Sequence, residues 1–152
     1  MSPTYRYALT DQDRMACFDV RIEVFVKGQD VPLELERDEF DAVAEHIVAE
    51  DENGRIVGTA RLRYIGDIAK IERVAVLEEA RGKGIGRGMM AFIIEKTAEK
   101  GDIAKLKLGS QTHAMAFYAA MGFEAVGWEY MDAGIPHHDM VKENITKETI
   151  KG

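Results

Sequence analysis

Apolar residues recur at helical spacing in three parts of the chain. In the first part they are Met15, Phe18, Ile22, Phe25 and Val26. Their intervals of three and four predict an amphipathic helix that ends near Gly28, and Thr10 stands where its N-cap belongs. The same reasoning predicts a helix over about residues 85–100 and a short one over residues 113–121, which ends at Gly122.

Short β-branched or alternating stretches predict the strands. They lie at about residues 5–9, 47–49, 55–63, 69–76, 103–108, 123–130 and 138–141. Asn53-Gly54 suits a hairpin turn, so the strands on either side of it are expected to pair antiparallel. Residues 29–41 have no usable period and are expected to form a loop. The order β-α-β-β-β-α-β-α-β-β predicts an α/β (α+β) fold, with helices flanking a mixed, largely antiparallel sheet.

Composition favours one compact domain over residues 1–152. Hydrophobic residues make up 46% and charged residues 31% of the 152 positions, and neither repeats nor a linker interrupt them. Cys17 is the only cysteine, so the chain forms no internal disulfide, which favours a reducing, cytoplasmic location. Because the sequence has neither a signal-peptide pattern nor an apolar run of membrane-spanning length, we expect no membrane partner.

A local reversal of charge follows the strand at residues 69–76. The chain carries 20 Lys and Arg against 27 Asp and Glu, a net charge of −7, which argues against nucleic acid as a partner. Four glycines nevertheless fall between residues 82 and 88, together with Arg81, Lys83 and Arg87. A Gly-rich turn between a strand and a helix N-terminus presents backbone N–H groups to an anion, so the segment predicts a phosphate ligand.

The spacing of this segment excludes two common nucleotide motifs. A P-loop requires Ser or Thr after Gly-Lys, but Gly84 follows Lys83. The dinucleotide pattern G-x-G-x-x-G fails as well, because its last glycine would be Arg87 or Met89.

The segment does match R-x-x-G-x-G over residues 81–86, and here the chain resembles the GNAT superfamily of acetyl-CoA-dependent N-acetyltransferases. In that family the motif holds the pyrophosphate of coenzyme A, so the resemblance implies acetyl-CoA as the cofactor. It also implies that backbone N–H groups of Val74 and Val76 contact the thioester and the pantetheine. The implied cofactor-binding residues are Val74, Ala75, Val76, Arg81, Gly82, Lys83, Gly84, Ile85, Gly86, Arg87 and Gln111.

The resemblance extends over about residues 5–142. Residues 111–123 are similar to a second signature of the family, an alanine, a tyrosine four residues later and then Gly-Phe, although Gln111 stands where many members have Asn. Residues 21–26, 29–32 and 134–137 further resemble the small bacterial ElaA/YjcF-type branch, whose members are described as predicted acyltransferases.

Two side chains are candidates for proton transfer. Tyr118 matches the tyrosine that lies beside the cofactor sulfur in similar enzymes, where it would protonate the departing thiolate; the alternative is packing in the core. Related enzymes often carry a carboxylate base at the position of Glu72. Alternation would place Glu72 on the apolar face of Val74 and Val76, which would raise its pKa. The alternative for Glu72 is an ion pair with Arg61, Arg63 or Arg73.

Other polar groups carry weaker hypotheses. The acidic residues between Glu34 and Asp41 are either a solvated loop or an attraction for a cationic amine. His137 and His138 are adjacent on a strand and point to opposite faces, so no metal site is expected.

Together these observations predict an N-acetyltransferase that moves acetyl from acetyl-CoA to a primary amine of a small molecule or peptide by direct attack. One alternative is an enzyme similar to acyl-homoserine-lactone synthases, and another is a non-catalytic acyl-CoA-binding module. A homodimer is common among similar proteins, but no feature of this sequence establishes one.

Overall fold

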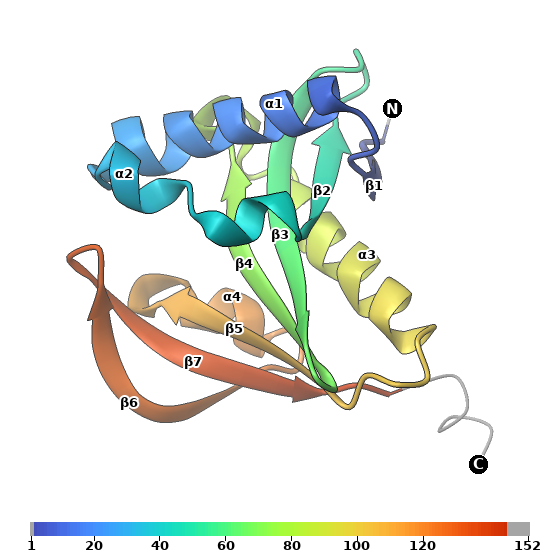
Figure 1. Ribbon diagram of the computed structural model, residues 1–152, viewed down its shortest axis with the longest axis vertical. Helices are drawn as coiled ribbons and strands as arrows, with labels where there is room; N and C mark the ends of the chain where they lie inside the picture. The colour runs from blue at the N-terminus through green and yellow to red at the C-terminus, as the bar shows by residue number, and fades with distance from the viewer. Residues whose placement is uncertain (1, 146–152) are drawn as a thin grey trace. The chain divides into compact units, whose positions relative to one another are not determined.

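The computed structural model describes residues 2–145 (Figure 1). The strands are β1 (Thr4–Tyr7), β2 (Glu45–Glu50), β3 (Ile56–Ile65), β4 (Ile68–Val76), β5 (Lys105–Gln111), β6 (Glu124–Asp132) and β7 (Ile135–Glu143). The helices are α1 (Asp11–Arg21), the π-helical η1 (Ile22–Lys27), α2 (Leu33–Glu36), α3 (Ile85–Ala98) and α4 (Met115–Ala119). Three short 3-10 segments complete the elements: η2 (Glu39–Ala42), η3 (Glu78–Ala80) and η4 (Thr112–Ala114).

The strands form a seven-stranded sheet in the order β1-β2-β3-β4-β5-β7-β6. β4 and β5 pair in parallel, whereas β1 with β2, β2 with β3, β5 with β7 and β6 with β7 pair antiparallel. The prediction of a mixed, largely antiparallel sheet flanked by helices is therefore confirmed. The hairpin predicted at Asn53-Gly54 joins β2 to β3, and Gly54 has the positive φ of 81° that this turn requires.

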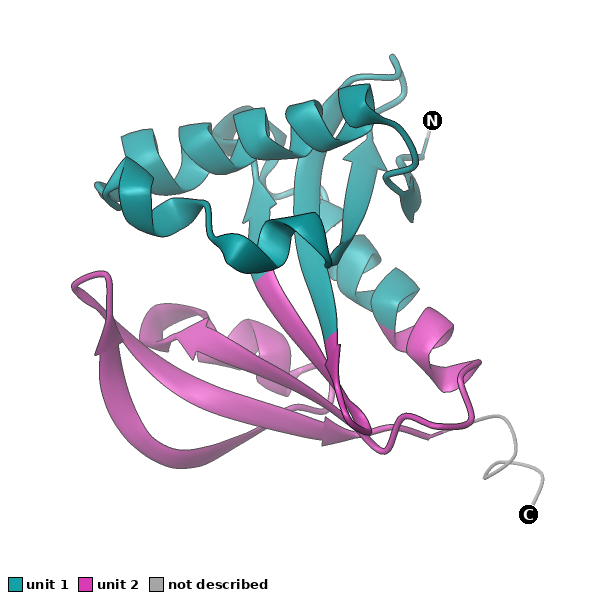
Figure 2. Ribbon diagram, in the orientation of Figure 1, with its two compact units in different colours: residues 1–63, 73–93 teal, residues 64–72, 94–152 magenta. Residues whose placement is uncertain are grey.

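The chain divides into two compact units (Figure 2). The first unit comprises residues 1–63 and 73–93, and the second comprises residues 64–72 and 94–152. The first unit contains α1, η1, α2, β1 and β2, most of β3 and the start of α3. The second contains the β5–β7–β6 sheet and α4.

In the first unit, helices cover both faces of β2 and β3. Consecutive buried residues in both strands show that neither face is open to solvent. On one face His46 contacts Phe18 of α1. On the other face Gly58 lies so close to Ile85 and Met89 of α3 that an added Cβ would be 3.3 and 3.2 Å from their side chains. α1 and α3 therefore lie on opposite faces of these strands (Figure 1).

The N-terminal helix has the predicted extent but changes geometry along its length. Thr10 caps it by accepting a hydrogen bond from the Asp13 N–H, as expected. From Ile22 to Lys27 the helix widens to π geometry and ends at Gly28. Apolar periodicity indicates which face of a helix is buried, and α-helical and π-helical windings share that signal.

The prediction that residues 29–41 form a loop is wrong in part, because this segment contains α2 and most of η2. Each element is only four residues long, too short for an apolar period to appear in the sequence. η2 is closed by a capping box in which Asp38 accepts from its N-terminal turn and Asp41 accepts from the Asp38 N–H. Local hydrogen bonds to side chains, rather than an amphipathic pattern, therefore form this turn.

In the second unit, one face of β5 is buried and β6 is exposed throughout. Leu106, Leu108 and Ser110 alternate as the buried positions of β5. Every residue of β6 is exposed, and Trp128 most of all at 90%. The short helix predicted over residues 113–121 is α4, with η4 as a 3-10 turn before it.

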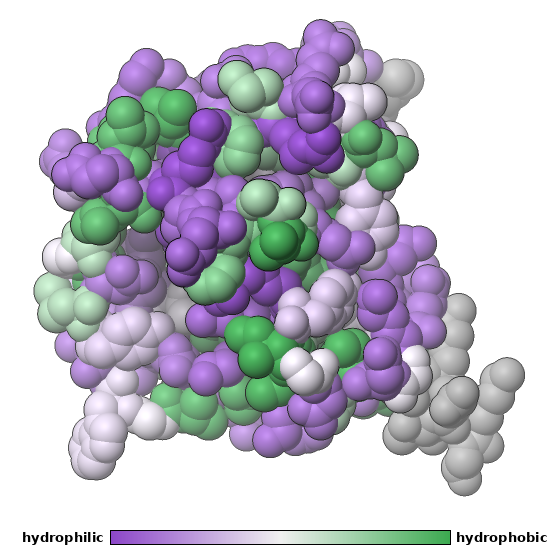
Figure 3. Space-filling model, in the orientation of Figure 1, coloured by the Kyte–Doolittle hydropathy of each residue, from purple (hydrophilic) through white to green (hydrophobic). Residues whose placement is uncertain are grey.

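Hydrophilic and hydrophobic residues are interspersed on the face seen in Figure 3. Within the described part of the chain, no helix combines the length and the apolar character needed to cross a membrane.

Candidate functional site

The turn between β4 and α3 has the backbone geometry of an anion site. Gly82 and Gly84 have φ values of +78° and +80°, which L side chains rarely adopt. An added Cβ at either glycine would meet no atom within 4 Å, so the conformation rather than space requires glycine here. α3 begins at Ile85, and the first N–H groups of a helix have no partner within the helix. Turned N–H groups and the positive helix end together attract a negatively charged group.

Buried apolar side chains hold this turn in place. Ile85 and Met89 of the first turns of α3 are 4% and 0% exposed and belong to one core cluster with Ala75 and Leu77. The Leu77 N–H also donates to the Val57 carbonyl at 2.9 Å, which ties the end of β4 to β3. The backbone N–H groups of the turn are therefore presented by a rigid support.

The three cations predicted for the phosphate site are exposed, two on this turn and the third in the first turn of α3. They are Arg81, Lys83 and Arg87. Arg81 Nε donates to the Val76 carbonyl at 3.0 Å, which fixes its side chain beside the last residue of β4. The predicted cofactor-binding residues from Val74 to Val76 and from Arg81 to Arg87 all belong to the first unit.

A bend interrupts β4 just before Val74. Arg73 has a φ of +54°, and the register between β4 and β5 covers only Ile68–Ile71. An uninterrupted alternation from Glu72 to Val74, which the sequence argument assumed, is wrong because Arg73 leaves the extended conformation.

Acidic and basic side chains form a buried ion-pair network in the first unit. Arg21 of α1, 1% exposed, donates from Nε to Glu36 at 2.8 Å and from a terminal nitrogen to Asp41 at 2.7 Å. Arg61 of β3, also 1% exposed, lies 3.0 Å from Asp41 and 2.6 Å from Asp38. Burial by itself would raise the pKa of Asp41, but hydrogen bonds from Arg21, the Asp38 N–H and Arg61 hold it well below the ordinary value. Three of the acids between Glu34 and Asp41 are therefore neutralised by arginines.

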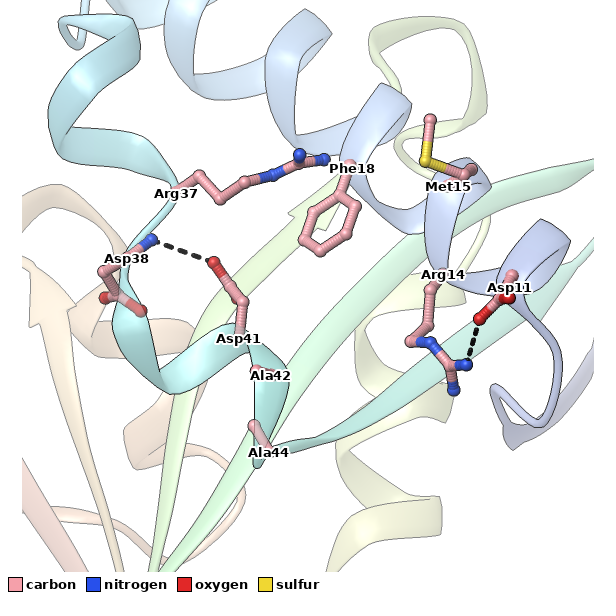
Figure 4. Close-up of a pocket in the computed structure, with 9 residues that line it drawn as sticks. All are labelled: Asp11, Arg14, Met15, Phe18, Arg37, Asp38, Asp41, Ala42 and Ala44. Carbon is pink, nitrogen blue, oxygen red and sulfur yellow. Dashed lines mark hydrogen bonds and ion pairs between the residues drawn. The ribbon is translucent and has the colours of Figure 1, made fainter.

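A surface pocket of about 640 Å³ lies beside this network (Figure 4). Its lining residues are Asp11, Arg14, Met15, Phe18, Arg37, Asp38, Asp41, Ala42 and Ala44. The Arg37 guanidinium stacks 3.6 Å from the centre of the Phe18 ring. The carboxylates of Asp38 and Asp41 are occupied by the arginines of the network, and Asp11 pairs with Arg14. The pocket therefore carries little uncompensated charge.

In the second unit, Tyr118 is a buried residue of α4. It is 9% exposed and lies edge-on against Phe117 and Phe123, with ring centres 5.0 and 6.1 Å away. Burial raises its pKa to about 12. The phenol therefore stays protonated across the whole neutral range.

Gln111 and Glu72 also belong to the second unit and have polar partners there. Gln111 Oε1 lies 2.7 Å from His113 Nε2 at the end of β5. The Glu72 side chain is 15% exposed, and one of its carboxylate oxygens lies 3.7 Å from Lys70 Nζ. Glu72 is therefore a half-buried carboxylate with at least one cationic neighbour.

The sequence did not predict the buried network or the role of Arg73 in it. Arg21, Arg61 and Arg73 are far apart along the chain, and each lies in an element that was predicted for other reasons. The acidic run between Glu34 and Asp41 was the available signal, but a run of acids alone does not reveal where its cations come from.

Comparison with known proteins shows which family this chain belongs to. Residues 10–144 match the model described as an acetyltransferase (GNAT) domain. Among curated proteins, YjcF of Bacillus subtilis, described as an uncharacterized N-acetyltransferase, is 39% identical over 137 residues, which is 90% of this chain and 96% of YjcF.

Solved structures of similar proteins have the same fold. The crystal structure of Escherichia coli ElaA has a TM-score of 0.83 at 27% identity and covers 93% of this chain and 100% of its own. An acyl-CoA N-acyltransferase from Pseudomonas aeruginosa has a TM-score of 0.80 at 29% identity and covers 93% and 98%. The resemblance to the ElaA/YjcF-type branch is thereby confirmed.

Proposed function

Because the chain belongs to the GNAT family of acetyltransferases, we propose that it is an acetyl-CoA-dependent N-acetyltransferase that acts on a primary amine of a small molecule or peptide. The observation that carries the choice of donor is the turn between β4 and α3. Its two left-handed glycines, the N-terminus of α3 and the three exposed cations beside them suit a pyrophosphate, in a chain whose net charge is −7.

The residues of this turn fit coenzyme A, and we assign them to its phosphates. The N–H groups of Gly82, Gly84 and Ile85 would donate to the pyrophosphate, and Arg81, Lys83 and Arg87 would add charge. Val74 and Val76 would contact the thioester and the pantetheine through their backbone N–H groups. Bound acetyl-CoA supplies an acyl group that is already activated as a thioester.

In the proposed reaction, the chain's own residues move the protons of a direct transfer. Glu72 accepts the proton that the acceptor ammonium must lose before its nitrogen forms the new C–N bond. A backbone N–H of β4 stabilises the charge that develops on the thioester oxygen while the C–S bond breaks. Tyr118 donates its proton to the sulfur as the C–S bond breaks and regains a proton from the attacking nitrogen, which must lose its second proton to become the amide. With a pKa of about 12, the phenol is a weaker acid than the thiol it forms, so this proton moves in concert with C–S cleavage.

The assignment of the phosphates is tested by coenzyme A binding. We expect the double variant Arg81→Ala with Lys83→Ala to weaken binding by about 1 to 3 kcal/mol in calorimetry, since it removes two charged phosphate contacts. Arg14→Ala with Lys27→Ala is the control, because it removes the same two charges from α1 and η1. If both double variants lose affinity equally, the attraction is a general effect of charge and the site is misassigned.

The mechanism is tested by turnover. We expect Tyr118→Phe and Glu72→Gln each to lower kcat by about 100-fold, the range of general acid–base catalysis, with little change in coenzyme A affinity. Tyr64→Phe, a half-buried tyrosine of the same unit, is the control. Unchanged kcat in both catalytic variants would overturn the proposed proton transfers and leave the cofactor assignment standing. Binding of acyl-CoA by a wild-type protein that acetylates no amine would favour the non-catalytic module.

A further inference from the structure

Arg73 is held in an unfavourable backbone conformation in the middle of a strand. Its φ is +54°, in the left-handed region that favours glycine, and the position lies inside β4. Among the described residues, the other non-glycine residues with positive φ are Asp30 and Ala133, and both lie in connections between elements. A strand does not adopt this bend spontaneously, so other contacts must maintain it.

The guanidinium of Arg73 supplies these contacts. Its Nε donates to the Glu36 carbonyl at 3.0 Å and lies 3.3 Å from a Glu36 carboxylate oxygen. A terminal nitrogen donates to the Leu35 carbonyl at 3.4 Å and to Asp38 at 3.3 Å. One side chain of β4 is therefore bound to four acceptors of the segment that runs from α2 to η2.

That segment is itself fixed to the core of the first unit. Arg21 of α1 binds both Glu36 and Asp41, and Arg61 of β3 binds both Asp38 and Asp41. Glu36, Asp41 and the two arginines are at least 93% buried, so water does not compete for these bonds. Because these bonds fix the segment, the hydrogen bonds from Arg73 to it restrict the movement of β4 at this residue.

We propose that Arg73 is a positioning residue for acyl transfer, and that Glu36 and Asp38 hold it in place. The bond from the guanidinium to the α2–η2 segment maintains the bend of β4 immediately before Val74 and so sets the direction of the N–H groups that follow it. This inference rests on the proposed function, in which the N–H groups of Val74 and Val76 contact the thioester and the pantetheine. Arg73 touches no reacting atom in this scheme.

The test separates positioning from general stability by substituting Arg73 in two ways. Arg73→Ala removes the guanidinium and leaves a side chain that disfavours positive φ. Arg73→Gly also removes the guanidinium but adopts the bend freely. Both variants leave the buried arginines paired with Asp38, Asp41 and Glu36. Arg6→Ala is the matched control, because Arg6 also binds two carboxylates in the first unit, Asp13 and Glu50, but lies on β1.

For Arg73→Ala we expect kcat to fall by about 10- to 100-fold, because a small displacement of a positioned donor has this effect, while the Kd for coenzyme A stays within about twofold. Arg73→Gly recovers part of the loss. Arg6→Ala retains the wild-type kcat. A kcat of Arg73→Ala within twofold of wild type, or an equal loss in Arg6→Ala, overturns the proposal. If Arg73→Ala does not fold, the comparison of Arg73→Gly with Arg6→Ala decides in the same way.

Amide hydrogen exchange gives a second readout that needs no turnover. We expect the N–H groups of Val74 and Val76 to exchange about tenfold faster in Arg73→Ala than in wild type, while Val48 of β2 is unchanged. If the wild-type protein acetylates no amine, the proposed function fails, and exchange at Val74 still decides whether Arg73 holds the bend. Unchanged exchange at Val74 and Val76 overturns the inference whether or not the protein is an acetyltransferase.

Discussion

Tyr118 shows how strongly packing changes the chemistry of one side chain. Phe117 and Phe123 surround its ring, and burial raises its pKa to about 12. An ordinary tyrosine has a pKa of about 10, one or two units above that of a thiol. The folded chain makes it a weaker acid, so a proton that it donates must leave as the sulfur develops its charge.

The raised pKa of Tyr118 predicts a loss of stability at high pH. The folded state retains the phenolic proton more tightly than the unfolded state, so this contribution is complete below about pH 10 and is lost as the pH rises toward 12. We expect the free energy of unfolding of wild type to fall more steeply across this range than that of Tyr118→Phe, as measured by urea denaturation. Equal slopes would mean that the hydroxyl is solvated in the folded state.

At the scale of elements, α3 packs against β1 at Gly88, a position where no larger residue fits beside Tyr5. A Cβ on Gly88 of α3 would lie 1.9 Å from the Tyr5 hydroxyl oxygen and 2.2 Å from the carbon that carries it. Glycine inside a helix costs about 1 kcal/mol relative to alanine, so this position retains glycine against its helix propensity. The Tyr5 ring occupies the space instead.

Gly88→Ala therefore tests this packing, because its effect on the free energy of unfolding should change sign when Tyr5 is removed. We expect it to destabilise the wild-type protein by about 1 to 3 kcal/mol because the Tyr5 ring must move. In a Tyr5→Ala background the same substitution should become neutral or stabilising, since only the helix propensity remains. Thermal or urea unfolding of the four proteins gives the coupling energy, and an equal loss in both backgrounds would contradict the contact.

The sequence pattern predicted some helices and strands much better than others. Long segments with a clear period, such as α1, β3 and α3, were predicted with nearly correct bounds. α2 and η2 were not, because four-residue elements carry no period and are formed by capping and by bonds from distant arginines. A hydrophobic pattern indicates which side of one helix or strand is buried. The conformation of these short turns depends instead on hydrogen bonds from residues in other elements.

For the whole molecule, the network around Asp41 concentrates charged groups, of which Arg21, Arg61, Glu36 and Asp41 are almost fully withdrawn from water. Arg21, Arg61 and Arg73 neutralise Glu36, Asp38 and Asp41. Removing one partner of such a pair leaves a buried charge uncompensated, so the acid sensitivity of the fold should depend strongly on these carboxylates.

The depressed pKa of Asp41 predicts where that sensitivity lies. A carboxyl whose folded pKa is below its unfolded value contributes stability above about pH 4 and loses it as the pH falls. We expect Asp41→Asn to be less stable than wild type by about 3 to 5 kcal/mol at pH 7, with the difference shrinking toward pH 2.

Asp11→Asn is the control for this experiment, since the Asp11 side chain is 95% exposed and pairs with the half-exposed Arg14. It should match wild type at every pH within about 0.5 kcal/mol. A difference between Asp41→Asn and wild type that does not change with pH would assign the loss to packing rather than to the ionised carboxylate.

The sequence alone determined the class of sheet, the helices that flank it and the Gly-rich turn, because periodicity and turn chemistry act over neighbouring residues. It also pointed to the family, since the turn between β4 and α3 is continuous in the chain. Only the tertiary structure decided that Arg73 bends β4, that Arg21 and Arg61 neutralise the acidic segment and that Tyr118 is a buried phenol. These properties depend on which residues, far apart in the sequence, come together in the low-dielectric interior, and the spacing of neighbouring residues does not indicate this.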